Sequence, residues 1–319
     1  MRCVSSHPII EGNQIINNNS NYGGGGVSTF QSAVTMRNNI ITDNWALMKG
    51  GGIFFYHSDD CTIERCLVSN NSSETGGGVY IEISPNTVLN NCTIADNEAD
   101  NWVGGLFTAT FSFPVITNCI VWNNNAPQQS GIYSAGDDSL TVNYSDIQAG
   151  YSGIGNICLD PLFLNPGGPD YHLQPNSPCI DAGDPSYPLD PDSTISDMGM
   201  FYFDQRIYEI QISAVPDTLP IVIPASGGNF GFTVNIENTS VTNQIVNAWS
   251  EVILPNSSIY GPLFSRSSVN LNPGQLINRR LTQNIPAGAP SGAYQYRLML
   301  EESLYGFPID SSGFDFVKE

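Results

Sequence analysis

The chain has 319 residues, of which 10 are basic and 30 acidic, so its formal net charge at neutral pH is −20. A surface of this sign repels phosphate backbones and anionic lipid headgroups, which disfavours nucleic acid or a membrane surface as the partner. No apolar run approaches the roughly 20 residues that cross a bilayer as a helix, so we expect no membrane insertion. The length is sufficient for two domains, each with its own core.

An internal repeat runs through the first half of the chain. Glycines that are each followed by an aliphatic residue recur every 26 or 27 residues, at Gly26, Gly52, Gly78, Gly105 and Gly131. A second series keeps the same spacing, at Asn18, Asn44, Asn71, Asn97 and Asn124. Two series in step indicate an array of similar structural units, such as a solenoid.

The N-terminal residues already belong to this repeat. Residues 9–19, IIEGNQIINNN, contain the repeated asparagine at Asn18, and the preceding residues have no apolar signal-peptide core. We therefore expect the sequence to start inside the solenoid, with a secretion signal and an N-terminal cap upstream. This expectation places the protein outside the cell or on the cell surface.

Each repeat contains three short strand patterns. In residues 50–71, Ile53 and Phe55 alternate with Phe54 and Tyr56, and two further apolar runs follow. Helix formers are scarce and the LxxLxL pattern of leucine-rich repeats is absent. The repeat therefore predicts an all-β fold, a right-handed parallel β-helix with about 26 residues per coil.

Two kinds of corner are expected in each coil. The position between the second and third strands holds one residue that we expect in the left-handed conformation, which asparagine tolerates well. This position is occupied by Asn38, Arg65, Asn91 and Asn118. The glycine triplets are expected to turn another corner through their backbone freedom.

The alternation after the glycines predicts an aromatic stripe. If Val27, Ile53 and their equivalents point inward, the next residue of each coil points outward. These outward positions are Ser28, Phe54, Tyr80, Phe107 and Tyr133. A row of exposed rings about 4.8 Å apart would let an extended glycan stack along the solenoid. The alternatives are that loops of the same coils cover the rings, or that stacking alone stabilises them.

The seven cysteines do not predict a disulfide framework or a zinc site, because their number is odd and no CxxC motif occurs. Three of them, Cys66, Cys92 and Cys119, occupy one repeat position. We expect them to be small buried residues stacked from coil to coil.

The coils, such as NCTIADNEADNWVGGLF at residues 91–107, resemble those of pectate-lyase-like right-handed β-helix proteins, which include bacterial adhesins and surface proteins. Residues 144–204, with the motifs SPCIDAGDP and SDMGM, are similar to a terminal module that closes the solenoid in many secreted bacterial β-helix proteins. Met200 stands where that module usually has alanine. The resemblance covers residues 9–204.

This resemblance also sets out the chemistry that an enzyme of the type would need. Lyases of this kind use a basic residue with bound Ca²⁺, and up to residue 205 the cations are limited to Arg2, Arg37, Lys49 and Arg65. Related hydrolases use aspartates with a histidine and an Arg-x-Lys motif. Only the segment HSDD, with His57, Asp59 and Asp60, is similar to part of that set. We interpret it as a solvated loop and predict no catalytic residue.

The terminal module is rich in aspartate. The segment DPDSTISD places Asp190, Asp192 and Asp197 within eight residues of a loop, and Ca²⁺ prefers such oxygen ligands. The central glycine and closing glutamate of an EF-hand are missing. We consider a Ca²⁺ site here, with a series of Asx-turns as the alternative.

The C-terminal part has a different pattern. Its segments alternate apolar and polar residues and are separated by turns that contain Pro, Gly and Asn. This pattern predicts an antiparallel β-sandwich. It resembles the immunoglobulin-like or fibronectin-like modules of bacterial surface proteins, without a cysteine pair. We expect domains at residues 1–205 and 206–319.

Two functions are consistent with these observations. The first is a non-catalytic secreted or cell-surface protein whose β-helix wall binds a polysaccharide or a partner, with the sandwich as spacer. The second is a carbohydrate-active enzyme, a polysaccharide lyase or glycoside hydrolase, that acts on the same wall.

Overall fold

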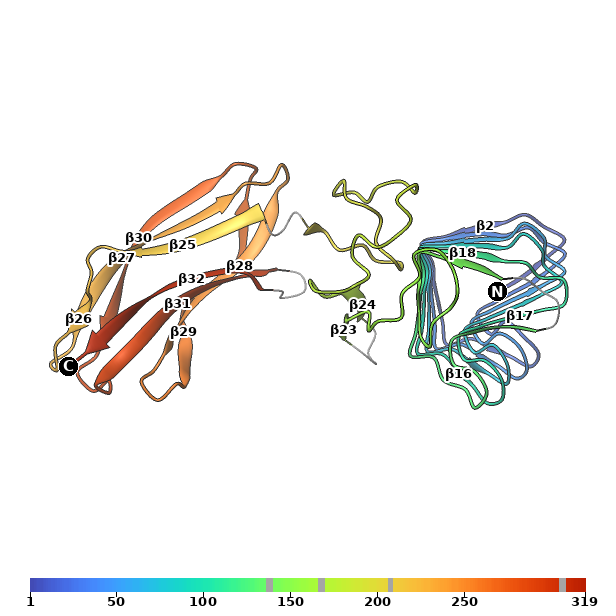
Figure 1. Cartoon of the computed structure of the whole chain (residues 1–319), viewed down its shortest axis with the longest axis horizontal. Coiled ribbons are helices and arrows are strands. Elements are labelled where there is room, and N and C mark those ends of the chain that lie inside the picture. The colour runs from blue at the N-terminus through green and yellow to red at the C-terminus, as the bar shows by residue number, and fades with distance from the viewer. Residues whose placement is uncertain (136–139, 166–169, 206–208, 304–307) are drawn as a thin grey trace. The chain divides into compact units, whose positions relative to one another are not determined.

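The computed structural model describes residues 1–135, 140–165, 170–205, 209–303 and 308–319. The chain divides into two compact units, Met1–Phe203 and Asp204–Glu319. The division lies two residues before the boundary expected from the sequence. Both units are built from β-strands, and the predicted all-β fold is confirmed (Figure 1). No described segment forms a helix with the length and apolar character that crossing a bilayer requires.

The N-terminal unit is a solenoid of parallel sheets that run along its length. The first sheet contains β1 (Arg2–Val4), β5 (Val27–Phe30), β9 (Ile53–Tyr56), β13 (Val79–Glu82), β17 (Leu106–Ala109) and β20 (Ile132–Ala135). The second contains β2 (Ile9–Glu11), β6 (Thr35–Arg37), β10 (Thr62–Glu64), β14 (Val88–Asn90), β18 (Val115–Thr117) and β21 (Thr141–Asn143). The third contains β3 (Gln14–Ile16), β7 (Ile40–Thr42), β11 (Leu67–Ser69), β15 (Thr93–Ala95), β19 (Ile120–Trp122) and β22 (Asp146–Ile147).

A short fourth sheet precedes the glycine corner. It contains β4 (Asn19–Ser20), β8 (Trp45–Ala46), β12 (Ser72–Ser73) and β16 (Glu98–Ala99). Equivalent residues of successive coils pair in register, as Val79 does with Ile53 and Leu106. The aliphatic residues after the glycines form a buried column in the core, as predicted: Val27, Ile53, Val79, Leu106 and Ile132.

The two corners have different physical causes. The left-handed position between the second and third sheets is confirmed, with φ of 53°, 48°, 47° and 55° at Asn38, Arg65, Asn91 and Asn118. At the glycine corner only the first glycine of a triplet, such as Gly76 with φ +68°, needs conformational freedom. The third is required by contact, because a Cβ on Gly78 would lie 2.8 Å from a backbone oxygen of the next coil. The expectation that backbone freedom explains the whole triplet is therefore wrong in part.

The repeated asparagines form a buried ladder. The Asn71 side-chain amide donates to Asn97 Oδ1 at 3.0 Å and to the Ile41 carbonyl at 2.9 Å. Asn97 Oδ1 also accepts the Asn71 backbone N–H at 3.0 Å. The same contacts join Asn44 to Asn71. The ladder thus satisfies backbone groups that the tight bend leaves without strand partners.

The cysteines are free thiols, and all except Cys158 are buried. Cys66, Cys92 and Cys119 stack in the core as expected. Burial raises the pKa of Cys66 to about 12, which keeps this thiol protonated and unreactive.

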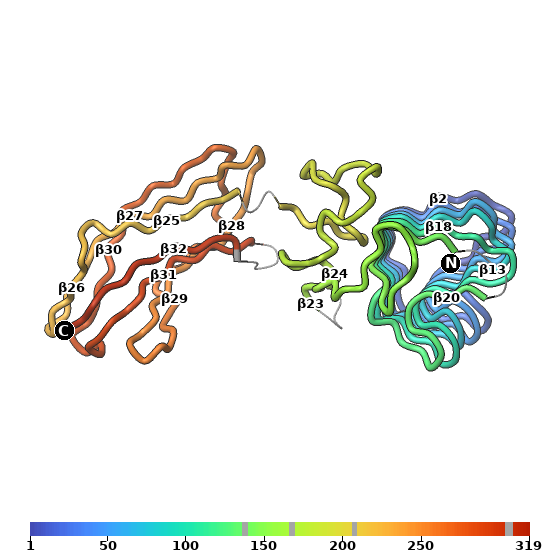
Figure 2. The backbone as a smooth tube through the Cα atoms, in the orientation of Figure 1, coloured from blue at the N-terminus to red at the C-terminus, as the bar shows by residue number. Residues whose placement is uncertain are grey.

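The terminal module has two parts. The first continues the solenoid, since the Ile147 N–H donates to the Ile157 carbonyl at 3.0 Å. The second, residues 159–165 and 170–203, lies along one side of the coils, and we name it the lateral brace (Figure 2). It contains the antiparallel pair β23 (Phe163–Asn165) and β24 (Asp170–Leu173). The module therefore both extends the stack and supports its side.

The C-terminal unit consists of two sheets that enclose one apolar core, which includes Phe232, Tyr296 and Phe316. The smaller sheet has the order β25 (Ile210–Pro216), β27 (Gly228–Asn238), β30 (Leu276–Ile285). The larger has the order β26 (Val222–Ile223), β32 (Pro308–Lys318), β31 (Gly292–Glu302), β28 (Gln244–Ile253), β29 (Ile259–Leu271).

Candidate functional site

The outer face of the first sheet carries the predicted aromatic column. Tyr80 pairs in register with Phe54 on one side and Phe107 on the other, and Phe107 pairs with Tyr133. The four rings occupy the outward positions because their inward neighbours fill the core. We name this column, together with the neighbouring rings of Tyr22 and Trp102, the aromatic wall.

The column is mostly covered. The exposed fractions of Phe54, Tyr80 and Phe107 are 2%, 6% and 7%, whereas that of Tyr133 is 38%. The expectation that all four rings face solvent is therefore wrong for three of them. The alternative that loops of the same coils cover the rings describes the structure.

Three side chains from the corner before the glycines provide this cover. Tyr22 meets Phe54 edge-on at 6.0 Å between ring centroids, and Trp102 approaches Phe107 at 6.5 Å. Lys49 Nζ lies 4.9 Å from the centroid of the Tyr80 ring, a cation–π contact. The rings of the column are thus the floor of the wall, and the corner residues lie over it.

The exposed edge of the wall includes two residues, Tyr22 and Trp102, that the sequence pattern did not predict. Tyr22 is 52% and Trp102 42% exposed. Trp102 and Tyr133 have their ring centroids 5.8 Å apart with an interplanar angle of 46°. Tyr22 directly precedes Gly23, and Trp102 lies two residues before Gly104. An aromatic residue in a turn that otherwise carries polar residues was the signal that would have found them.

A charged pair lies within the aromatic wall. Lys49 Nζ and Glu82 Oε2 are 2.6 Å apart, and both side chains are largely but not fully buried. Burial, the largest single effect, would lower the pKa of Lys49, but the hydrogen bond to Glu82 and the interactions of the ammonium with Tyr80, Glu82 and Tyr22 together raise it. Lys49 therefore stays charged at neutral pH, and its contact with Glu82 holds polar atoms beside the rings.

Two surface hollows flank the first sheet. The column has no ring at Ser28, and a hollow of about 630 Å³ opens there between Tyr22, Phe30 and Tyr56. A second hollow of about 690 Å³ is lined by a histidine and aspartate group that includes the HSDD segment, namely His7, His57, Asp59 and Asp60.

The HSDD residues have structural contacts. The His57 ring lies against Tyr56, with centroids 4.5 Å apart. Asp60 Oδ1 accepts a hydrogen bond from the Asn86 amide at 3.1 Å. Within the described residues no ion pair joins His57 to either aspartate. The interpretation as a loop agrees with these contacts.

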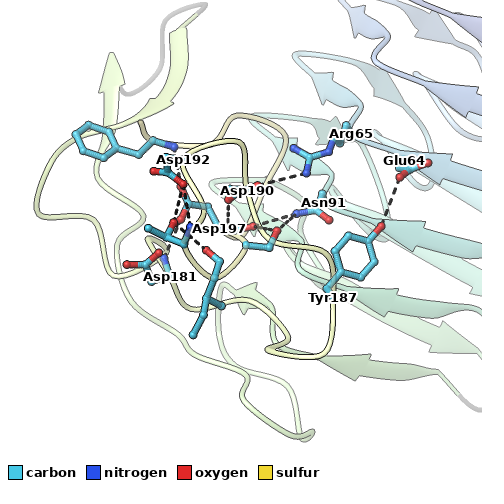
Figure 3. A network of polar contacts seen from close by, with 12 residues as sticks. Glu64, Arg65, Asn91, Asp181, Tyr187, Asp190, Asp192 and Asp197 are labelled. Carbon is cyan, nitrogen blue, oxygen red and sulfur yellow. Dashed lines mark hydrogen bonds and ion pairs between the residues drawn. The ribbon is translucent and has the colours of Figure 1, made fainter. Parts of the chain in front are cut away.

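The aspartates of the lateral brace form hydrogen bonds with backbone amides (Figure 3). The Asp197 carboxylate accepts the N–H groups of Asp181 and Phe203 at 2.8 and 2.6 Å. Asp190 Oδ2 accepts the Asp197 N–H at 2.7 Å, and its Oδ1 lies 3.3 Å from the Arg65 guanidinium. Asp192 accepts from the Thr194 N–H and hydroxyl.

This arrangement does not support the considered Ca²⁺ site at Asp190, Asp192 and Asp197. Among the residues that the structure describes, no three His, Cys, Asp or Glu side chains are grouped to hold a metal. Asp192 forms an Asx-turn with Thr194, as the alternative expects. Asp190 and Asp197 instead accept amides six to sixteen residues away, so a series of Asx-turns explains the cluster only in part.

The brace is attached to three successive coils. The Asn91 amide donates to the Asp197 carbonyl at 3.0 Å, and the Asn118 carbonyl accepts the Gly199 N–H at 2.7 Å. Gly199 has φ +94°, and a Cβ there would lie 2.8 Å from Ile120 Cδ1. The glycine of the motif SDMGM therefore allows the brace to pack closely against the coils.

Residues 5–158 match the family model for a right-handed β-helix region. The N-terminal unit is a right-handed parallel β-helix. No curated protein matches the chain.

Three solved structures illustrate the structural matches. A CARDB domain from Pyrococcus furiosus is 12% identical, with 34% of this chain and 94% of that chain covered and a TM-score of 0.26. A FixG-related protein from Vibrio parahaemolyticus is 18% identical, with 35% and 97% covered and a TM-score of 0.25. A PapD-like domain of human CEP192 is 16% identical, with 40% and 96% covered and a TM-score of 0.24. Scores this low establish no relationship.

The brace predicts how the stability of the β-helix depends on pH. Burial raises the pKa of Asp197 to about 7, and the nearby Asp190 and Asp181 add to this effect. The folded state therefore holds a proton that an unfolded aspartate releases near pH 4. As pH falls from 8 to 5, this group should raise the free energy of unfolding by about 2 kcal/mol.

Urea denaturation at pH 8, 6.5 and 5 measures this effect. The variant Asp197→Asn cannot ionise, and we expect its stability to change less over the same range. The substitution also places an amide N–H₂ against a backbone donor, so we expect it to be less stable than the wild type at every pH. Equal pH dependence of the two proteins would exclude Asp197 as the titrating group.

Proposed function

We propose that this protein is a non-catalytic, secreted or cell-surface protein that binds a polysaccharide on the aromatic wall. The observation that carries the proposal is the pair of exposed rings of Trp102 and Tyr133, whose centroids lie 5.8 Å apart. Sugar C–H groups stack on such rings, and exposed rings on a folded surface indicate a binding function. The C-terminal sandwich acts as a spacer in this proposal.

The chemistry of the wall favours a glycan without many negative charges. The chain carries a net charge of −20, which repels a polyuronate. Within the wall, the Lys49 and Glu82 pair supplies a donor and an acceptor for sugar hydroxyls. The hollow beside Ser28 lies on the outer face of the same sheet.

The double variant Trp102→Ala/Tyr133→Ala tests the proposal. We expect retention on neutral polysaccharides such as xylan, mannan and soluble cellulose, measured by affinity electrophoresis, to fall at least tenfold. The melting temperature should change little, because both side chains are partly exposed. A wild-type protein that none of these polysaccharides retains would contradict the proposal.

Phe107→Ala is the matched control from the buried floor of the same wall. We expect it to cost about 3 kcal/mol of stability, because the side chain is 7% exposed and its loss leaves a cavity. If the double variant were destabilised as much as Phe107→Ala, the exposed rings would be structural.

The second candidate is a carbohydrate-active enzyme. The observation in its favour is the hollow that brings His7 and His57 to the same surface as Asp59 and Asp60. Reducing-end assays on every retained polysaccharide separate binding from cleavage. Release of new reducing ends by the wild type, abolished in Asp59→Asn/Asp60→Asn, would establish the enzyme and overturn the non-catalytic proposal.

A further inference from the structure

On one side of the C-terminal sandwich, side chains accept hydrogen bonds from the backbone N–H groups of an edge strand. The outer edge of β25 would expose its backbone amides, but Asp310 and Ser312 of β32 accept from them. The Ile212 N–H donates to Asp310 Oδ2 at 2.8 Å, and the Ala214 N–H to Ser312 Oγ at 3.0 Å. These bonds leave the edge of β25 unavailable to another strand.

The opposite side has two edge strands, β29 and β30, each the last strand of its sheet. Strand β29 contains Pro262, and its pairing with β28 shifts register twice. Proline and bulges protect an edge from further pairing. Strand β30 pairs with β27 over ten residues without a register shift, and it contains neither proline nor glycine. The free edge of β30 is therefore the one suited to accept a strand.

Apolar hollows lie between β29 and β30. One has a volume of about 230 Å³ and is lined by Phe264 of β29 together with Ile277 and Leu281 of β30. Another of about 300 Å³ is lined by Leu263 and Ile285 among others. Their positions along β30 match alternate residues of a strand, so every second side chain of an added strand would enter a hollow.

We name the surface between β29 and β30 the seam. It carries arginine side chains that form no ion pair with the described residues. Arg266 and Arg279 line the smaller hollow, and neither forms an ion pair with a residue that the structure describes. Arg280, the next residue, faces the other side and pairs with Asp217 at 2.5 Å. In a chain of net charge −20, this seam is a local basic site that favours an acidic ligand.

A second copy of the chain fits this edge less well. Antiparallel pairing of two β30 strands about their centre would bring Arg279 and Arg280 of each copy into neighbouring positions. Like charges that close to each other are destabilising across a strand pair. The charge pattern therefore favours a different, acidic partner.

We propose that β30 is a docking edge for an extended acidic segment of a partner protein. The segment adds to the smaller sheet as a fourth strand, places apolar side chains in the hollows between β29 and β30, and directs a carboxylate to Arg279. This inference concerns the C-terminal unit and is independent of glycan binding by the β-helix.

The experiment uses the full chain and a fluorescent ten-residue peptide of alternating valine and threonine, with glutamate in place of the central valine. We expect saturable binding by fluorescence anisotropy. Arg279→Gln should weaken it at least tenfold, because the charged hydrogen bond is lost. The control Arg280→Gln removes the same charge from the other face of the same strand, and should weaken binding less than twofold.

Further measurements make the test decisive. A peptide with lysine in place of glutamate should bind at least tenfold more weakly, and bound peptide should protect amides of residues 276–285 from hydrogen exchange. No saturable binding to the wild type, equal loss in the two arginine variants, or equal binding of the lysine peptide would overturn the proposal. Dimerisation of the chain through β30 in sedimentation velocity, without peptide binding, would also overturn it.

Discussion

Asn71→Leu is expected to lower the free energy of unfolding by about 4 kcal/mol. The substitution removes the Oδ1 acceptor of the Asn44 backbone N–H and side-chain amide, at 3.0 and 2.9 Å. It also removes the donor to the Ile41 carbonyl. Each buried polar group left without a partner costs about 1 to 3 kcal/mol, and leucine offers none a replacement. Urea denaturation followed by circular dichroism measures the change.

Asn101→Leu is the matched control, because Asn101 is exposed in a loop of the same β-helix. We expect its stability to stay within about 0.5 kcal/mol of the wild type. If Asn71→Leu and Asn101→Leu were equally stable, the ladder would contribute little, and sheet pairing alone would hold the coils together.

Gly51→Ala should be still more damaging and is expected to abolish folding of the β-helix or cost more than about 4 kcal/mol. A Cβ at this position would lie 2.4 Å from the Gly77 carbonyl oxygen and 2.5 Å from that of Ser72. Both contacts are with backbone in the stacked coils, so relief requires the coils to separate. Soluble expression and the thermal unfolding curve report the outcome.

Gly12→Ala separates steric contact from conformational strain. Gly12 has φ +66°, and its Cβ would meet no atom within 4 Å. We expect a loss of only about 1 kcal/mol, the cost of an alanine in the left-handed conformation. A Gly51→Ala protein as stable as Gly12→Ala would show that the glycine corner has room to adjust.

The architecture of the β-helix was predictable because each coil requires the same residue types at the same positions, so the period is visible in the sequence. Gly78 leaves room for the backbone of the next coil, and Asn97 forms hydrogen bonds with Asn124. Equivalent positions meet the same need, so the same residue type returns in successive coils. The physical role of the asparagine ladder was not predictable, since period alone does not distinguish a left-handed bend from a buried hydrogen-bonded side chain.

The cover of the aromatic wall was harder to foresee. Alternation correctly assigned Tyr80 to the outer face of its strand. The cover of the column comes from Lys49 over Tyr80, Tyr22 over Phe54 and Trp102 over Phe107, and these three lie in corners with no shared residue type. The spacing of the aspartates likewise showed their proximity in sequence but not the direction of their oxygens, which the fold of the brace determines.

The lateral brace has a consequence for the number of coils. Its contacts at Arg65, Asn91 and Asn118 lie on consecutive coils and match fixed positions along residues 184–200. A coil duplicated before Arg65 would preserve every one of these contacts. A coil inserted between Arg65 and Asn118 would move the attachment points apart by about 4.8 Å, more than a hydrogen bond can span. The brace thus acts as a molecular ruler, which permits the protein to lengthen in evolution at one end of the stack and prohibits insertion along the measured segment.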